Sequence, residues 1–300
     1  MTWFLAAASA GEWMDKTFLS FDLGIFNFFG QMGNDVLNVI AKIFTNFGGT
    51  KYGALMLILA IALVLFKRTR KYGMALLLSI LLGLLVTNGI IKPLFMRVRP
   101  YNTLQHIPEF FNWYTKAGML AESDYCFPSG HTTAAFEMAI SMFLCFRAAG
   151  KKKFAWIFPV VAIFTALSRI YLMVHYATDV IAGAIIGIVM GIIGYNISRL
   201  ITNKFSGTYR WERFDLELPI QKKTGRPISR KTACRVIAIA WAVMFAVTLV
   251  FTLNEGGNSL RCAYDREYKC YNEVKQKDKY LIDGQYYCEI HTNQLKEEQQ

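Results

Sequence analysis

Charged residues are scarce in this 300-residue sequence: Asp, Glu, Lys and Arg together make up 18% of it, against about 25% in ordinary soluble domains. Hydrophobic residues make up 54% and aromatic residues 15%, so an unfolded chain would leave too much apolar surface in water, which excludes disorder. The 22 Gly and 7 Pro are too few for a collagen-like or low-complexity chain. These absences leave a membrane protein with several spans.

Acidic residues are fewer than basic ones, 21 against 33, which gives a formal net charge of +12. A basic chain can indicate nucleic-acid binding, but the Lys and Arg residues cluster between apolar runs and form no long basic stripe. An excess of Lys and Arg in cytoplasmic loops explains the same net charge in a membrane protein. We therefore expect a lipid bilayer and no nucleic acid as partner.

Seven apolar runs are candidate membrane spans, since a helix needs roughly 20 mostly apolar residues to cross a bilayer. The first run contains Asp35 and Lys42, which are seven residues apart, share one helical face, and are expected to point into a bundle. The predicted fold class is all-α, an integral membrane bundle of six core transmembrane helices plus a seventh C-terminal span. The seven runs are 24–47, 52–66, 72–91, 132–146, 154–168, 180–198 and 236–254.

These runs divide the chain into five predicted parts. They are an N-terminal segment (1–23), a six-helix core (24–200), a basic cytoplasmic loop (201–233), an extra transmembrane helix (234–254) and an extracytoplasmic Cys-containing tail (255–300).

Loop charge predicts the orientation of the bundle. Basic residues gather at 67–71, at 147–153 and at 199–235, the last with ten Lys or Arg. If the spans alternate, all three segments face the same side, which the positive-inside rule assigns to the cytoplasm. The loop 92–131 and the turn 169–178 then face the other side. We expect a bacterial inner-membrane protein whose functional site is extracytoplasmic.

Cysteine usage agrees with this layout, because four of the six cysteines are expected on the oxidising side, where they can form two disulfides. Their pairing stays open. No close Cys-x-x-Cys pair occurs, so a zinc site is not expected. The four are Cys126, Cys262, Cys270 and Cys288, whereas Cys145 and Cys234 are expected to stay reduced.

The tail also contains Asp283-Gly284 between β-prone flanks. This pattern predicts a two-residue β-hairpin. We expect a small β-rich appendage over residues 258–292.

Three segments on the predicted outer side carry an unusual set of polar residues. Cations that converge at the mouth of a bundle repel one another, and these have no obvious carboxylate partners nearby in sequence; a bound polyanion would relieve the repulsion, with Arg matching phosphate oxygens as a planar fork. The backbone N–H groups of a Ser-Gly pair before a helix also favour an anion. The set therefore predicts a phosphate site. Its members are Lys92 and Arg99-Pro100; Pro128-Ser129-Gly130-His131; and Ser168-Arg169, His175 and Asp179.

His175 and Asp179 are four residues apart and would share one face of a helix. A carboxylate on one imidazole nitrogen fixes the tautomer and raises the basicity of the other nitrogen, which suits a nucleophilic imidazole. His131 is then available as a general acid for the leaving oxygen. These segments contain no cluster of carboxylates with the spacing of metal ligands. We therefore expect the Lys and Arg side chains to neutralise the phosphoryl oxygens in place of Mg²⁺. We expect no metal and no cofactor.

The three segments resemble the tripartite signature of the type 2 phosphatidic acid phosphatase family, which shares its catalytic core with vanadium haloperoxidases. KPLFMRVRP, PSGH and SRIYLMVHYATD match Lys-x6-Arg-Pro, Pro-Ser-Gly-His and Ser-Arg-x5-His-x3-Asp at every signature position. The resemblance covers roughly residues 20–200.

The resemblance implies a role for each matched residue. His175 attacks phosphorus and forms a phosphohistidine, Asp179 orients it, and His131 protonates the leaving group. Ser168 belongs to the signature as a supporting residue. The groups implied to hold phosphoryl oxygens are Lys92, Arg99, Ser129, Gly130 and Arg169.

The resemblance also implies a lipid phosphate substrate: a polyprenyl diphosphate, which we favour, phosphatidate or phosphatidylglycerol phosphate. The alternatives are a lipid phosphotransferase, which would use a lipid or glycan acceptor in place of water, a haloperoxidase, which the spans disfavour, and a transporter. The apolar runs 180–198 and 236–254 disfavour a transporter, because they place few polar groups along a path through the bilayer.

Overall fold

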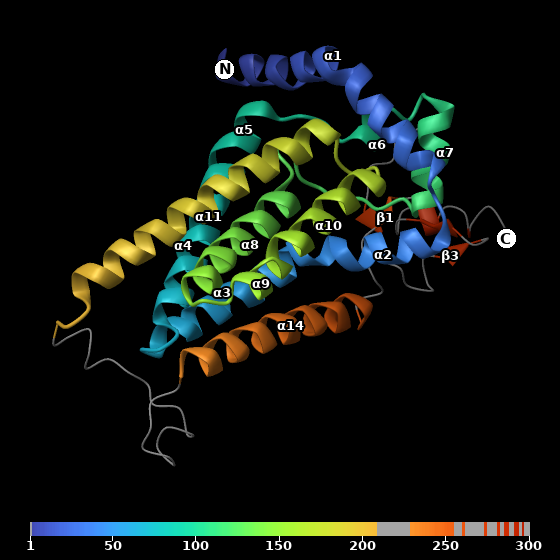
Figure 1. Ribbon diagram of the computed structural model, residues 1–300. Coiled ribbons are helices and arrows are strands. Elements are labelled where there is room, and N and C mark those ends of the chain that lie inside the picture. The colour runs from blue at the N-terminus through green and yellow to red at the C-terminus, as the bar shows by residue number, and fades with distance from the viewer. Residues whose placement is uncertain are drawn as a thin grey trace.

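The structure is a computed structural model that describes residues 2–208 and 229–254, together with residues 260–261, 273–274, 281–282, 285–287, 291–293 and 296. Within these residues it is predominantly helical, which confirms the all-α class (Figure 1). The α-helices are α1 (Thr2–Gln31), α2 (Asp35–Thr45), α3 (Thr50–Leu65), α4 (Arg70–Leu84), α5 (Lys92–Phe95), α6 (Pro100–Thr103), α7 (Pro108–Ala117), α8 (Gly130–Ala148), α9 (Lys152–Ala155), α10 (Ile157–Tyr171), α11 (Ala177–Phe205) and α14 (Arg230–Asn254). A 3₁₀ turn, η1 (Asn46–Gly48), and a π-helical turn, η2 (Leu85–Ile91), complete the helical elements.

Four helices of the described part are long and apolar enough to cross a membrane: Arg70–Thr103, Lys152–Tyr171, Ala177–Phe205 and Thr232–Asn254. A fifth span arises if Asp35–Gly48 and Thr50–Leu65, which meet at a bend of 42°, count as one broken span. The predicted total of seven is therefore not confirmed. The 19-residue α8 is not among the four; it packs against α4, α10 and α11 in the middle of the bundle.

The predicted first span, 24–47, is wrong as a single helix. The helix α1 ends at Gln31, and α2 begins at Asp35 after Asn34, whose side chain accepts a hydrogen bond from Leu37 N at 2.9 Å. Asp35 is exposed in the first turn of α2, where the helix dipole favours a carboxylate, so it does not point into the bundle. The cap, a local interaction, outweighs the apolar pattern here.

A ladder of glycines joins the two central helices, α8 and α11. A Cβ added at Gly183, Gly187 or Gly191 of α11 would lie 2.6–2.9 Å from backbone carbonyl oxygens of Ser129, Thr133 and Glu137 respectively. Small residues four apart let two helix backbones approach closely. The contact begins at the first turn of α8, so it brings the start of α8 beside the start of α11, where Ser129 N donates to Asp179 O at 3.1 Å.

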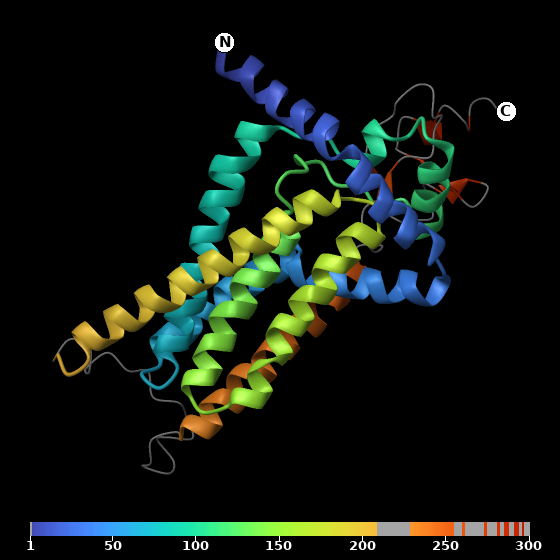
Figure 2. The same cartoon turned by 45° about the horizontal axis from the view of Figure 1, so that its top comes forward.

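The N-terminal helix α1 crosses one end of the bundle (Figures 1 and 2). It runs without a break across the predicted boundary at residue 23 and packs against α5, α7, α10 and α11. At the opposite edge, α14 packs against α3 and η1. The predicted six-helix core is therefore covered at one end by α1 and along one side by α14.

The predicted tail hairpin is supported by its two strands. Strand β3 (Leu281–Ile282) pairs antiparallel with β4 (Gln285–Tyr286), with Leu281 opposite Tyr286. Strand β1 (Leu260–Arg261) likewise pairs with β2 (Glu273–Val274). The predicted turn residues, the tail cysteines and most of the predicted loop 201–233 lie outside the described residues.

Candidate active site

The structure brings the three sequence motifs together at the end of the bundle that α1 crosses. The motif residues lie at helix starts, at a helix end or in the connections at this end of the bundle. Lys92 begins α5, Arg99 precedes α6, His131 lies in the first turn of α8, Arg169 lies in the last turn of α10, His175 lies between α10 and α11, and Asp179 lies in the first turn of α11.

His175 is completely buried, and both of its ring nitrogens face polar groups. The Arg99 Nη1 donates to His175 Nε2 at 2.9 Å, so Nε2 carries the lone pair. The other nitrogen, Nδ1, lies 3.6 Å from Asp179 Oδ2. Burial lowers the pKa of His175, and the Arg99 charge lowers it further, against the opposing hydrogen bonds of Asp179 and Glu122. The imidazole is therefore neutral near pH 7, as a nucleophile requires.

Asp179 is held in place by several donors. Its Oδ2 accepts from Tyr176 N at 3.0 Å, which caps α11, and its Oδ1 accepts from Arg97 Nη1 at 2.6 Å. His175 itself precedes the helix, so the predicted shared helical face is wrong. The two side chains meet because the capping turn folds His175 back over the first turn of α11.

Cys126 lies in the site as a buried free thiol, so the predicted disulfide role of this residue is wrong. Its Sγ donates to Asp179 Oδ2 at 2.7 Å and lies 3.4 Å from His175 Nδ1. Burial raises the pKa of the Cys126 thiol well above its usual range, and the Asp179 charge raises it further. The thiol thus stays protonated and serves as a hydrogen-bond donor to the orienting carboxylate.

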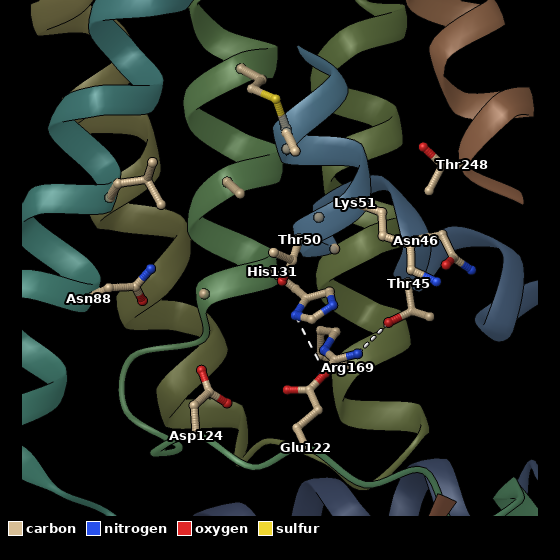
Figure 3. A pocket seen from close by; sticks show the side chains of 18 of the residues that line it. Thr45, Asn46, Thr50, Lys51, Asn88, Glu122, Asp124, His131, Arg169 and Thr248 are labelled. Atoms are coloured by element: carbon tan, nitrogen blue, oxygen red, sulfur yellow. Dashed lines mark hydrogen bonds and ion pairs between the residues drawn. The ribbon is translucent and has the colours of Figure 1, made fainter. Parts of the chain in front are cut away.

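Glu122 lies between the imidazoles of His131 and His175; Figure 3 shows it beside His131 and Arg169. Its Oε2 lies 2.8 Å from Arg99 Nη2 and 3.8 Å from His175 Nε2, and its Oε1 pairs with Arg169 and lies 3.5 Å from His131 Nδ1. Burial alone would raise the pKa of Glu122, but Arg169, His131 and Arg99 hold it well below its usual range. The site therefore holds an anion of its own.

A second carboxylate, Asp124, pairs with Lys92 and Arg99. Burial would raise the pKa of Asp124, but Arg99 and Lys92 lower it. The expectation that the cations lack carboxylate partners is thus wrong. Glu122 and Asp124 were missed although both lie within ten residues before His131, and this closeness to a motif was the available signal.

Two motif residues, Ser129 and Ser168, make hydrogen bonds within the protein, and a third, Gly130, faces the site. Ser129 is the N-cap of α8, its Oγ accepting from Thr132 Oγ1 at 2.9 Å, while its N–H is committed to Asp179 O. The hydroxyl of Ser168 donates to Thr165 O at 2.6 Å inside its own helix. Gly130 faces the site, since a Cβ there would lie 3.4 Å from Lys92 Nζ. Gly130 also lines the cavity of the site, and the predicted phosphate contacts of Ser129 and Gly130 stay predictions.

Arg97, inside the first motif, is the centre of a buried cluster that sequence reasoning missed. Its guanidinium donates to Asp179 Oδ1 at 2.6 Å, to Asp15 Oδ1 at 2.7 Å and to Asp22 Oδ2 at 3.1 Å, and it stacks on the Tyr176 ring at 3.8 Å. Asp15 and Asp22 belong to α1. The N-terminal helix therefore supports the orienting carboxylate through Arg97.

A cavity of about 650 Å³ opens from the site into the bundle. His131, Lys92, Arg169 and Glu122 line its mouth, together with residues of η1, α3, α4, α8 and α14. Figure 3 shows His131, Arg169 and Glu122 in this position. The described residues that line the cavity do not include His175. A substrate in this cavity would reach the site from the His131 side.

One group in the described residues has metal-ligand geometry: the ligand atoms of Cys126, His175 and Asp179 lie within 4.8 Å of one another. Two guanidinium groups oppose a cation there, because Arg97 contacts Asp179 and Arg99 contacts His175 at 2.6 Å and 2.9 Å. The donor set therefore fits proton and phosphoryl chemistry better than a divalent metal.

The motifs and their geometry agree with comparisons to known proteins. Residues 72–202 match the PAP2 superfamily. This segment is a PAP2 domain. The lipid A 4'-phosphatase of Porphyromonas gingivalis is 31% identical over 133 residues, 44% of this chain and 53% of the relative. The undecaprenyl-diphosphatase of Sulfolobus acidocaldarius is 31% identical over 129 residues, 42% of this chain and 54% of the relative. The match thus spans about half the length of these relatives.

A solved structure shares the fold. The crystal structure of a transmembrane PAP2 type phosphatidylglycerolphosphate phosphatase from Bacillus subtilis superposes with a TM-score of 0.50 at 23% identity, over 67% of this chain and 96% of that chain. The PAP2 domain contains all three motifs, whereas α1, α3 and α14 lie outside residues 72–202. The matched segment therefore does not include Asp15 and Asp22 of α1, nor the part of the cavity wall that α3 and α14 form.

Proposed function

We propose that this protein is a membrane lipid phosphatase that hydrolyses a lipid phosphate or diphosphate through a phosphohistidine. The observation that carries the proposal is the position of the Glu122 carboxylate, between the Nε2 of His175 and the Nδ1 of His131 and in contact with two guanidinium groups. A phosphoryl group in the same place would have a nucleophile on one side and an acid on the other. Relatives named as phosphatases support the same reaction class.

Burial and then the Arg169 charge lower the pKa of His131 to about 3, so its imidazole is neutral near pH 7. A bound phosphoryl anion would raise that pKa, and His131 would take up a proton as the substrate binds.

In the proposed first step, the lone pair on His175 Nε2 attacks phosphorus, and the bond from phosphorus to the leaving oxygen breaks. The protonated His131 gives its proton to that oxygen, and Asp179 stabilises the charge that develops on His175. Arg99, Arg169 and Lys92 neutralise the equatorial oxygens once Glu122 and Asp124 give way. Water, deprotonated by His131, then attacks phosphorus, breaks the P–N bond and releases phosphate.

Phosphate release from purified protein in detergent tests the proposal. We expect free phosphate from at least one of undecaprenyl diphosphate, phosphatidate and phosphatidylglycerol phosphate, and no loss of rate in EDTA, because the site neutralises charge with Lys and Arg. Label transfer to an added lipid or glycan acceptor without free phosphate would favour the phosphotransferase. An EDTA-inhibited rate that Mg²⁺ restores would contradict the metal-free site.

We also propose that the site faces the extracytoplasmic side of a bacterial inner membrane. The support is the polarity of the helices: α8 runs from His131 to Arg147, and α3 runs from the cavity mouth to the basic residues Lys67 and Arg68. A 19-residue helix is about 28 Å long, close to the thickness of the bilayer core. The basic ends are therefore on the opposite side from the site, as the positive-inside rule requires of a site outside the cytoplasm.

Cysteine labelling of intact cells tests this orientation. In a background with the three tail cysteines replaced by serine, a membrane-impermeant maleimide should label Lys116→Cys, on the exposed side of α7 near the site, and should not label Lys152→Cys until the cells are opened. Both lysines are exposed in the structure, so accessibility within the protein is matched. Labelling of Lys152→Cys alone from outside would reverse the topology.

A further inference from the structure

The cavity lies on the leaving-group side of the site. His131, the proposed acid, lines it, whereas His175 and Asp179 are fully buried behind the site. A group that departs with an oxygen protonated by His131 would therefore lie in this cavity. The groups that face the cavity next to His131 indicate the chemistry of that leaving group.

The start of α3 is the neighbour of His131. A Cβ on Gly48 would lie 2.1 Å from the His131 carbonyl oxygen, and one on Gly49 would lie 3.5 Å from its Nε2. Gly49 is the N-cap of the 16-residue α3 and supplies no side-chain cap, so the first N–H groups of that helix face the cavity with the positive end of the helix dipole. Such a helix start favours an anion.

The part of the cavity wall that η1, α3 and α14 form also carries a positive charge and polar side chains. Lys51, in the first turn of α3, lines the cavity and is the one charged side chain that the described lining residues of η1, α3 and α14 contribute. Thr252 of α14 donates to Asn46 Oδ1 at 3.3 Å and lines the cavity with it. Arg169 Nε, on the same cavity, is buried and has no hydrogen-bond partner among the described residues. A buried donor without a partner is costly unless a ligand supplies an acceptor.

A neutral alcohol, the leaving group of a lipid monophosphate, would need neither the helix start nor Lys51. We propose that this wall binds the phosphate that remains on the lipid, and that the substrate is therefore a lipid diphosphate. The inference rests on the proposed phosphatase function. In the reaction, the bond between the terminal phosphorus and the bridging oxygen breaks, His131 protonates that oxygen, and the product is a lipid monophosphate whose phosphate lies between α3 and the cavity mouth.

The test compares farnesyl diphosphate with farnesyl monophosphate, which carry the same chain. Wild-type kcat/KM should be at least on the order of tenfold higher for the diphosphate. Lys51→Met should lower the diphosphate value by about tenfold and the monophosphate value by less than about twofold. Lys51→Arg should restore most of the diphosphate rate, and Thr252→Val should shift the ratio in the same direction as Lys51→Met by a smaller factor. Lys153→Met, on the exposed side of α9, is the matched control and should change neither value.

Equal kcat/KM for the two wild-type substrates, or equal losses on both in Lys51→Met, would overturn the diphosphate inference while the phosphatase function stands. Release from neither farnesyl substrate, with release from phosphatidate, would overturn the inference in the same way. No release from any lipid phosphate by folded wild-type protein would overturn the phosphatase function and the inference together. Because Lys51→Met and Thr252→Val come from different helices, loss of folding in one leaves the other to decide.

Discussion

Replacement of His175 by alanine is expected to lower phosphate release by at least about 10³-fold, because no other described side chain can replace the nucleophile within reach of the phosphoryl group. The variant should still fold, since the imidazole contributes contacts to Arg99 and Asp179 but no membrane-spanning packing. The measurement is phosphate release from the purified variant, together with its elution as a single species in detergent.

His106→Ala is the matched control, because His106 is exposed on the same side of the bundle and outside the site; its rate should equal that of the wild type. Rapid acid-free quenching of the wild type with labelled substrate should also trap a phosphoenzyme that is labile to acid, and His175→Ala should trap none. Wild-type turnover by His175→Ala would refute the phosphohistidine mechanism.

Replacement of Arg97 by methionine is expected to destabilise the protein by about 3–5 kcal/mol, the usual cost of removing one partner of a buried ion pair. Asp22 and Asp179 have fully buried carboxylates, and Asp15 is 28% exposed, so the variant would leave three negative charges together without their shared cation. The measurement is the free energy or midpoint of unfolding in detergent for the two proteins.

Arg147→Met is the control for this variant, because Arg147 is exposed and its guanidinium lies over the Phe143 ring at 5.3 Å; its effect should stay within about 0.5 kcal/mol. The double variant Arg97→Met with Asp22→Asn should recover part of the loss, since it removes one of the unpaired charges. An unchanged midpoint in Arg97→Met would mean that the cluster contributes nothing to docking α1.

The assembly of the motifs at one end of the bundle could be predicted from the sequence, because Lys92, His131 and Arg169 each stand at the end of an apolar run on the same predicted side. The helical nature of those runs follows from composition alone. The position of a residue such as Asp22 could not be predicted this way, because its contact with Arg97 joins positions 75 residues apart and leaves no local pattern.

Single residues explain two other differences between the prediction and the structure: the break in the predicted span 24–47 and the free thiol of Cys126. Asn34 before Asp35 is a helix-start pattern, and it divides the run that was predicted as one span. Cys126 was assigned to disulfide chemistry from its expected compartment, but its position two residues before Pro128 placed it in the site. In the first case the prediction followed the apolar composition of the run 24–47, and in the second it followed the expected compartment of the loop. The structure shows that one residue decides each case: Asn34 starts a new helix, and Cys126 contacts Asp179.

The glycine contacts between α8 and α11 have a consequence for how the protein responds to bilayers of different thickness. His131, the proposed acid, lies in the first turn of α8, and His175, the proposed nucleophile, lies just before α11; these two helices touch backbone to backbone from Gly183 to Gly191. A thicker or thinner bilayer makes a helix tilt, but this pair can only tilt as one body. The distance between the two imidazoles should therefore change little with lipid composition. A larger residue at Gly183, Gly187 or Gly191 would separate the two helices and lower turnover without contacting the substrate.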